Sequence, residues 1–116
     1  LTANVVIHCV ASNARHQSSP EIVRACVRNA LARCEESGCR SIALPVFATG
    51  HARLPFDQAL RVIVQELAGS RLEHAYIVIN DEERIEDALA VIREYGFDPE
   101  VHRSLRVDEV ERSSWF

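Results

Sequence analysis

The chain has 116 residues, is 47% hydrophobic and 26% charged, and carries a formal net charge of −4 with a pI near 5.7. These values are ordinary for one small globular domain, and we expect a core at about residues 4–96 with a C-terminal extension at 97–116. The acidic balance argues against a nucleic acid held by a basic surface. The sequence has neither an apolar run of about 18 residues nor a signal-peptide pattern, so no membrane partner and a cytoplasmic location are expected.

The first predicted strand covers residues 4–10, where β-branched residues form a nearly continuous apolar run that is typical of a strand buried on both faces. A helix is predicted over 19–37. Either Ser19 caps it with Pro20 at the first position, or Ser18 and Glu21 form a capping box, and Gly38 is suited to the C-terminal stop. The apolar side chains of this helix fall on one face, and most of its charged side chains fall elsewhere and are expected in solvent. The apolar set is Ile22, Val23, Cys26, Val27, Ala30, Leu31 and Cys34, and the charged set is Arg24, Arg28, Arg33 and Glu35.

Two further strand–helix pairs follow. Residues 41–47 predict a buried strand, and Pro55 is expected to open a helix over 55–68 that ends at Gly69. Residues 74–80 predict the third strand, and Asn80 or Asp81 is expected to cap a helix over 82–95. The order β-α-β-α-β-α with short connections predicts an α/β fold with a mainly parallel sheet.

In such sheets ligands bind outside the carboxyl ends of the strands, which here are residues 10–13, 47–53 and 80–81. The middle end is the most informative, because Ala48, Thr49, Gly50, His51 and Ala52 form a loop of small or polar residues before a helix. Free backbone N–H groups and the helix dipole can hold an anion there, and Gly50 allows close approach or positive φ. Many α/β proteins, however, have a glycine after a strand for turn geometry alone.

The four cysteines, Cys9, Cys26, Cys34 and Cys39, have no zinc-finger spacing, so no metal site is predicted. Cys26 and Cys34 lie eight residues apart on a predicted helix, roughly 12 Å along its axis, which is too far for a disulfide. Free thiols in a reducing cytosol are the favoured interpretation.

Three segments in the same order resemble the macro domain, the ADP-ribose-binding module. Residues 6–10 (VIHCV) are similar to its V-I-H-x-V strand, and SIALP at 41–45 followed by Ala48-Thr49-Gly50 is similar to its S-I-A-x-P strand and diphosphate loop. Residues 75–81 occupy the place of its last strand, which borders the adenine. The resemblance covers about residues 5–92 and implies a three-layer α/β/α fold whose N-terminal strands are not matched in this sequence.

The resemblance implies that the chain binds ADP-ribose or a related nucleotide diphosphate, with no cofactor and no metal. The backbone of the loop would hold the diphosphate and Asn80 would lie near the adenine. The implied ligand-binding residues are Val10, Phe47, Ala48, Thr49, Gly50, His51, Ala52, Arg53 and Asn80. His51 and Arg53 make the loop more polar than is usual in the family.

The family's G-D-I and N-x-A-N segments, which hold the adenine amine and the distal ribose, have no counterpart here, so the catalytic residues stay unknown. Because the chain starts with leucine and contains no methionine, we expect an upstream segment in the parent protein. Two alternatives remain open: an ADP-ribosyl or O-acetyl-ADP-ribose hydrolase in that parent, and a ligand-free scaffold. The strand at 4–10 lacks the family's neighbouring strands, so self-association or an upstream segment is expected to complete the sheet.

Overall fold

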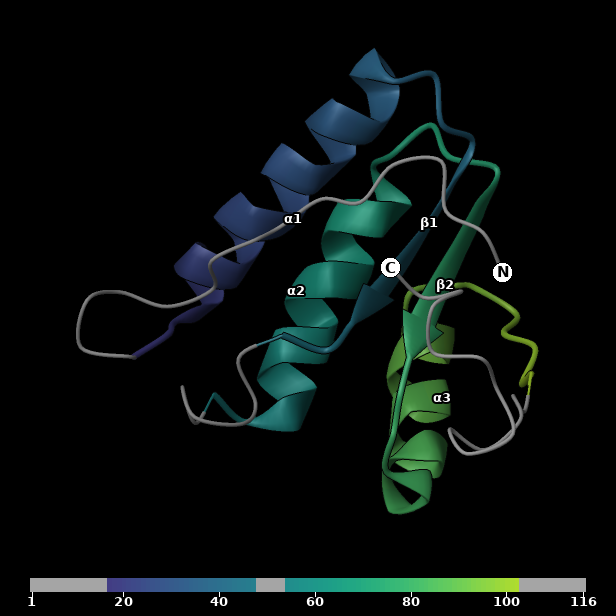
Figure 1. Cartoon of the computed structure of the whole chain (residues 1–116). Helices are drawn as coiled ribbons and strands as arrows, with labels where there is room; N and C mark the ends of the chain where they lie inside the picture. The colour runs from purple at the N-terminus through teal and green to yellow at the C-terminus, as the bar shows by residue number, and fades with distance from the viewer. Residues whose placement is uncertain (1–16, 48–53, 103–116) are drawn as a thin grey trace, which may run out of the picture.

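The computed structural model describes residues 17–47 and 54–102 (Figure 1). The predicted strand at 4–10, and with it Val10, lies outside the described residues. The elements follow in the order α1 (Pro20–Glu36), β1 (Ser41–Pro45), α2 (Phe56–Ala68), β2 (His74–Val78), the 3₁₀ turn η1 (Glu82–Arg84) and α3 (Ile85–Glu94). This order confirms the α/β class and the predicted alternation from α1 onward.

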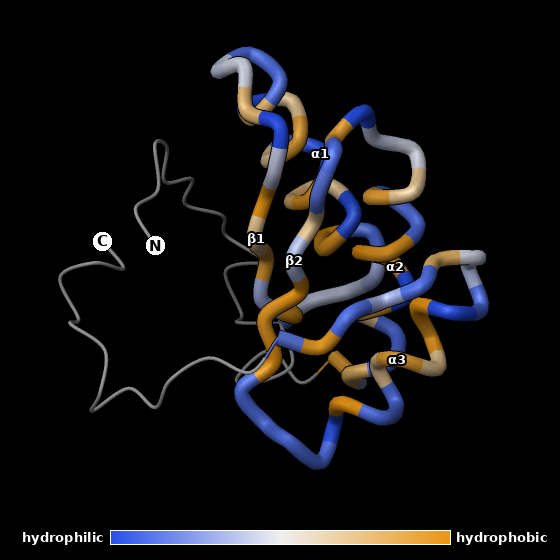
Figure 2. The backbone as a smooth tube through the Cα atoms, turned by 90° about the vertical axis from the view of Figure 1, so that its right-hand side faces the viewer, coloured by the Kyte–Doolittle hydropathy of each residue, from blue (hydrophilic) through white to orange (hydrophobic). Residues whose placement is uncertain are grey.

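β1 and β2 pair in parallel, and α2 connects them. All three helices lie on one side of this sheet (Figure 2), toward which the paired residues Leu44 and Ile77 point. The opposite side carries the pairs Ala43–Tyr76 and Pro45–Val78, which are exposed; Tyr76 retains 50% of its accessible surface. The described residues therefore form a helical layer on a sheet, and among them nothing packs as a second helical layer.

The ends of α1 confirm one of the two predicted arrangements. The Ser19 side chain accepts a hydrogen bond from the Ile22 backbone N–H at 3.2 Å, and Pro20 is the first helical residue. Ser18 Oγ is buried and has no hydrogen-bond partner within the described ranges, so the alternative capping box does not form. Gly38 has φ of 72°, the left-handed conformation that ends helices and that glycine adopts without strain.

The later helices begin differently from prediction. Pro55 has φ −55° and ψ 139°, so it precedes α2 as its N-cap instead of opening it, although its carbonyl accepts from the Ala59 N–H at 3.1 Å. The physical reason is that proline fixes only φ, and ψ follows the extended approach of the chain. Asp81 caps as predicted, but it caps η1, which then leads into α3.

The core lies on both sides of α2. One cluster joins α2 to α1 and β1, and a second joins α2 to α3. The first contains Val23, Val27, Leu44, Leu54, Ala59, Val62 and Ile63, and the second contains Leu60, Val64, Ala88 and Val91. No helix in the described part of the chain is long and apolar enough to cross a membrane.

Two arginines of the charged side of α1 form ion pairs with α2. Arg24 Nη1 and Arg28 Nε lie 3.0 Å and 2.8 Å from the same oxygen of Glu66. The Glu66 side chain is only 14% exposed, whereas Arg24 and Arg28 are 33% and 67% exposed. Arg28 therefore lies in solvent as expected, whereas Arg24 is more buried than expected. Neither contact with Glu66 was predicted, because helical periodicity does not show which polar side chains of a neighbouring helix lie within reach.

Gly38→Ala is expected to lower the free energy of unfolding by about 1 kcal/mol, because φ of 72° costs an L side chain about that much. No atom lies within 4 Å of the added methyl group, so a clash cannot cause the loss. The matched control is Gly69→Ala at φ −86°, where the nearest atom is 3.8 Å away; it should be neutral or stabilising by up to about 1 kcal/mol. Urea unfolding measures both, and equal effects would contradict the assignment of strain to Gly38.

Glu66→Ala should cost about 1 kcal/mol of unfolding free energy, because it removes a largely buried acceptor shared by two arginines. Arg33→Ala is the control, since the Arg33–Glu36 pair joins side chains that are 65% and 63% exposed within one helix. We expect less than about 0.5 kcal/mol there. Chemical denaturation of both variants would refute the ranking if Arg33→Ala proved the more costly.

Candidate functional site

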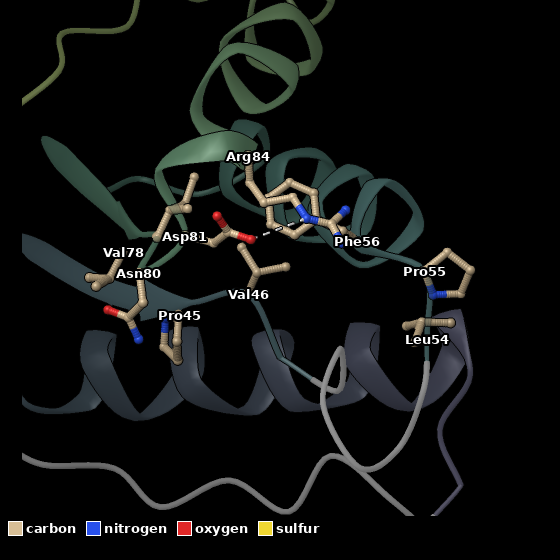
Figure 3. Close-up of a pocket in the computed structure, with 10 residues that line it drawn as sticks. Pro45, Val46, Leu54, Pro55, Phe56, Val78, Asn80, Asp81 and Arg84 are labelled. Carbon is tan, nitrogen blue, oxygen red and sulfur yellow. Dashed lines mark ion pairs between the residues drawn. The ribbon is translucent and has the colours of Figure 1, made fainter.

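A pocket of about 500 Å³ opens at the carboxyl ends of β1 and β2 (Figure 3). It is bounded by the last residues of both strands, by the start of α2 and by η1. The lining residues are Pro45, Val46, Leu54, Pro55, Phe56, Val78, Ile79, Asn80, Asp81 and Arg84. Its size falls in the range of small-molecule sites, and its position is where parallel sheets bind ligands.

The pocket follows from the parallel connection. Pro45 and Val78 are register partners, so the two strands end side by side. β1 ends at Pro45, and on the far side of residues 48–53 Leu54, which is 7% exposed, belongs to the core. Helix α2 then begins at Phe56 with no side-chain cap. The first N–H groups of a helix have no intrahelical partner, and here no capping side chain satisfies them. The positive end of α2 therefore lies at the pocket wall.

One wall combines an aromatic ring with charged groups. The Arg84 guanidinium lies over the Phe56 ring at 5.0 Å from its centroid, a cation–π contact. Arg84 Nε is 3.9 Å from Asp81 Oδ2, and the other carboxylate oxygen accepts from the Glu83 N–H at 3.0 Å (Figure 3). Arg84 and Asp81 are half exposed, so both can reach a ligand.

The predicted site residues fall into three groups. Asn80 lines the pocket. Phe47 is partly buried and packs against the first core cluster. The other predicted residues lie outside the described ranges: Val10, Ala48, Thr49, Gly50, His51, Ala52 and Arg53.

The lining residues that sequence reasoning did not name as site residues include Phe56 and Arg84, which form the aromatic and charged wall. Phe56 had a usable signal, since it follows the candidate loop directly at the start of a helix. Arg84 lies in a turn three residues beyond Asp81 and had none, because its contact with Phe56 joins residues 28 positions apart in the chain (84 − 56).

The family model described as "Macro domain" matches residues 1–63, more than half of the chain. The chain belongs to the macro domain family. The match contains β1, the start of α2 and the residues between them, whereas Asn80, Asp81 and Arg84 lie beyond it. The lining residues from Pro45 to Phe56 therefore lie within the family match, whereas the lining residues from Val78 onward are assigned to the pocket by the structure alone.

Several curated proteins are similar to this chain. An uncharacterized protein of Mycobacterium tuberculosis H37Rv is 38% identical over 64 residues, which are 55% of this chain and 18% of that protein. A macro domain-containing protein of Streptomyces coelicolor is 32% identical over 72 residues, 61% of this chain and 43% of that protein. An uncharacterized protein of Pyrobaculum aerophilum is 31% identical over 100 residues, 82% of this chain and 54% of that protein. The chain thus spans about half or less of the length of these relatives.

Asp81→Ala should destabilise the fold by about 1 kcal/mol, since it removes the cap on the Glu83 N–H and the partner of Arg84. Asp81→Asn separates the two effects, because asparagine caps as well as aspartate but carries no charge. We expect Asp81→Asn to stay within about 0.5 kcal/mol of the parent, because an exposed ion pair contributes little. Thermal melts of both variants provide the measurement; equal losses would show that charge, and not capping, dominates.

Proposed function

We propose that this chain binds ADP-ribose or a related nucleotide diphosphate in the pocket at the carboxyl ends of β1 and β2. Binding of ADP-ribose is general to macro domains. The observation that carries the proposal is the position of the pocket: it is bounded by Val46 and Leu54, which flank the segment that resembles the family's diphosphate loop.

The diphosphate would be held by the backbone between Phe47 and Leu54. Small residues in this segment leave the N–H groups accessible, and Gly50 allows phosphate to approach closely. Helix α2, whose start has no side-chain cap, follows this segment in the chain, and the positive end of its dipole favours negative charge. A backbone site of this kind needs no positively charged surface, which agrees with a chain whose net charge is −4.

The base and its ribose would lie toward the wall formed after β2. Asn80 offers an amide that both donates and accepts hydrogen bonds, so it suits the edge of a purine. Phe56 supplies apolar surface, and the half-exposed Arg84 above it adds a positive charge to the same pocket. On this proposal the pocket would join an anion-binding side to an aromatic and amide side, as a nucleotide diphosphate requires.

Calorimetric titration with ADP-ribose tests the proposal. Thr49→Ala and His51→Ala should weaken binding only modestly, by roughly 0.5–1.5 kcal/mol, if backbone N–H groups supply most of the affinity. Gly50→Val should abolish measurable binding, because a branched side chain blocks phosphate and disfavours positive φ. Gly69→Ala, at the opposite end of α2, is the control and should bind as the parent does.

Melting temperatures distinguish binding from folding. Loss of binding in a Gly50→Val protein that melts like the parent supports the loop. If the parent gives no saturable heat at millimolar ADP-ribose, ADP-ribose is rejected and the scaffold alternative is favoured. Release of ADP-ribose from a modified substrate by the parent would instead favour the hydrolase alternative.

A further inference from the structure

Two of the cysteines meet where α1 ends and β1 begins. Cys34 lies in the last turn of α1 and is 2% exposed, and Cys39, two residues before β1, is half buried. Three described cysteines, Cys26, Cys34 and Cys39, are free thiols, which confirms that part of the sequence prediction; Cys9 lies outside the described residues.

The backbone between the two residues has a defined geometry. The Cys39 N–H donates to the Cys34 carbonyl at 2.9 Å, and the Gly38 N–H donates to the Glu35 carbonyl at 3.1 Å. With Gly38 at φ 72°, these bonds form a Schellman motif in which Cys34 and Cys39 occupy the two positions whose side chains characteristically touch. In most helices that contact is between two apolar side chains, whereas here it is between two thiols.

The thiols interact with each other. Burial, a hydrogen bond with the Cys39 side chain and the charge of that side chain all raise the pKa of Cys34. Cys34 Sγ also donates to the Ser41 carbonyl at 3.8 Å, a weak hydrogen bond that holds it at the start of β1. Cys26, by contrast, lies about two helical turns from Cys34, too far to share this arrangement.

We propose that Cys34 and Cys39 form a redox-active dithiol, a modification site that reacts with small-molecule disulfides such as glutathione disulfide and closes to an intramolecular disulfide. The site lies at the amino end of β1, whereas the ligand pocket lies at its carboxyl end, so this proposal does not rest on nucleotide binding.

Exposure sets the order of the two steps. The Cys39 thiolate, which solvent reaches, attacks one sulfur of the small disulfide RSSR, releases RS⁻ and becomes Cys39–S–SR. Cys34 then loses its proton, and its thiolate attacks the Cys39 sulfur and releases the second RS⁻. In total, two protein thiols and RSSR give one protein disulfide and two RSH. The protein dithiol is oxidised and RSSR is reduced.

The sequence gives this site a direct readout. Trypsin cleaves after Arg33 and Arg40, so one peptide, residues 34–40, contains both cysteines and no other. The folded chain is incubated with glutathione disulfide, alkylated, digested and examined by mass spectrometry. We expect the 34–40 peptide of the parent to lose two hydrogen atoms and to take up neither glutathione nor alkylating reagent.

Three variants test the mechanism. Cys34→Ser should accumulate glutathione on Cys39, because nothing resolves the mixed disulfide. Cys39→Ser should stay largely unmodified at the buried Cys34. Cys26→Ser is the matched control and should close as the parent does.

A last comparison separates the effect of the fold from mere proximity in sequence. In a glutathione redox buffer, the equilibrium constant for closure should be about tenfold or more larger in the folded chain than in the urea-unfolded chain. Gly38→Ala, which strains the turn, should reduce that advantage. Equal closure of the folded and unfolded chains would overturn the proposal, as would a parent peptide that keeps glutathione on Cys39.

Discussion

The burial of α2 holds the described part of the chain together. Leu60 and Ile63 are fully buried and belong to different clusters, so two adjacent faces of this one helix pack against α3 and α1. Each such side chain contributes roughly 1.5–3 kcal/mol when removed from water. Figure 1 shows α2 between the other two helices, and β1 and β2 contact it through Leu44 and Ile77. Neither outer helix could keep its position without it.

The candidate site is a consequence of the same helix. α2 is the crossover between two parallel strands, so its amino end must lie beside the carboxyl ends of both. This places the start of α2, the end of β1 and the residues after β2 around one pocket. Leu54, buried in the core, fixes the point at which the chain returns to the helix. The geometry of the pocket is therefore set by packing that involves no ligand.

Sequence patterns predicted the elements well because local chemistry determines them. Ser19, Pro20 and Gly38 act at the ends of α1 as their side chains and backbone preferences require, and the apolar face of that helix is buried as expected. The short β1 and β2 were recognised from their apolar runs. Contacts between residues far apart in the sequence could not be predicted from these patterns. The pairing of Glu66 with Arg24 and Arg28, and of Arg84 with Phe56, depends on how helices and turns meet in space, which periodicity does not encode.

In the candidate site, too, local position could be predicted from the sequence but packing could not. The position of Asn80 at the pocket could be predicted from its place at a strand end, whereas the packing of Phe47 against the core was not predicted. A residue at a strand end has two faces available, and only the fold decides which of them its side chain uses.

The most direct test of the central claim is an NMR titration of the ¹⁵N-labelled chain with ADP-ribose. Saturable shifts in the amide spectrum are expected only at residues 46–57 and 79–84 and at Val10, the remaining predicted ligand contact. The amides of Gly38 and Gly69, which lie at the other ends of β1 and α2, should not move. Absence of shifts at millimolar ligand, or saturable shifts concentrated away from the carboxyl ends of β1 and β2, would contradict it.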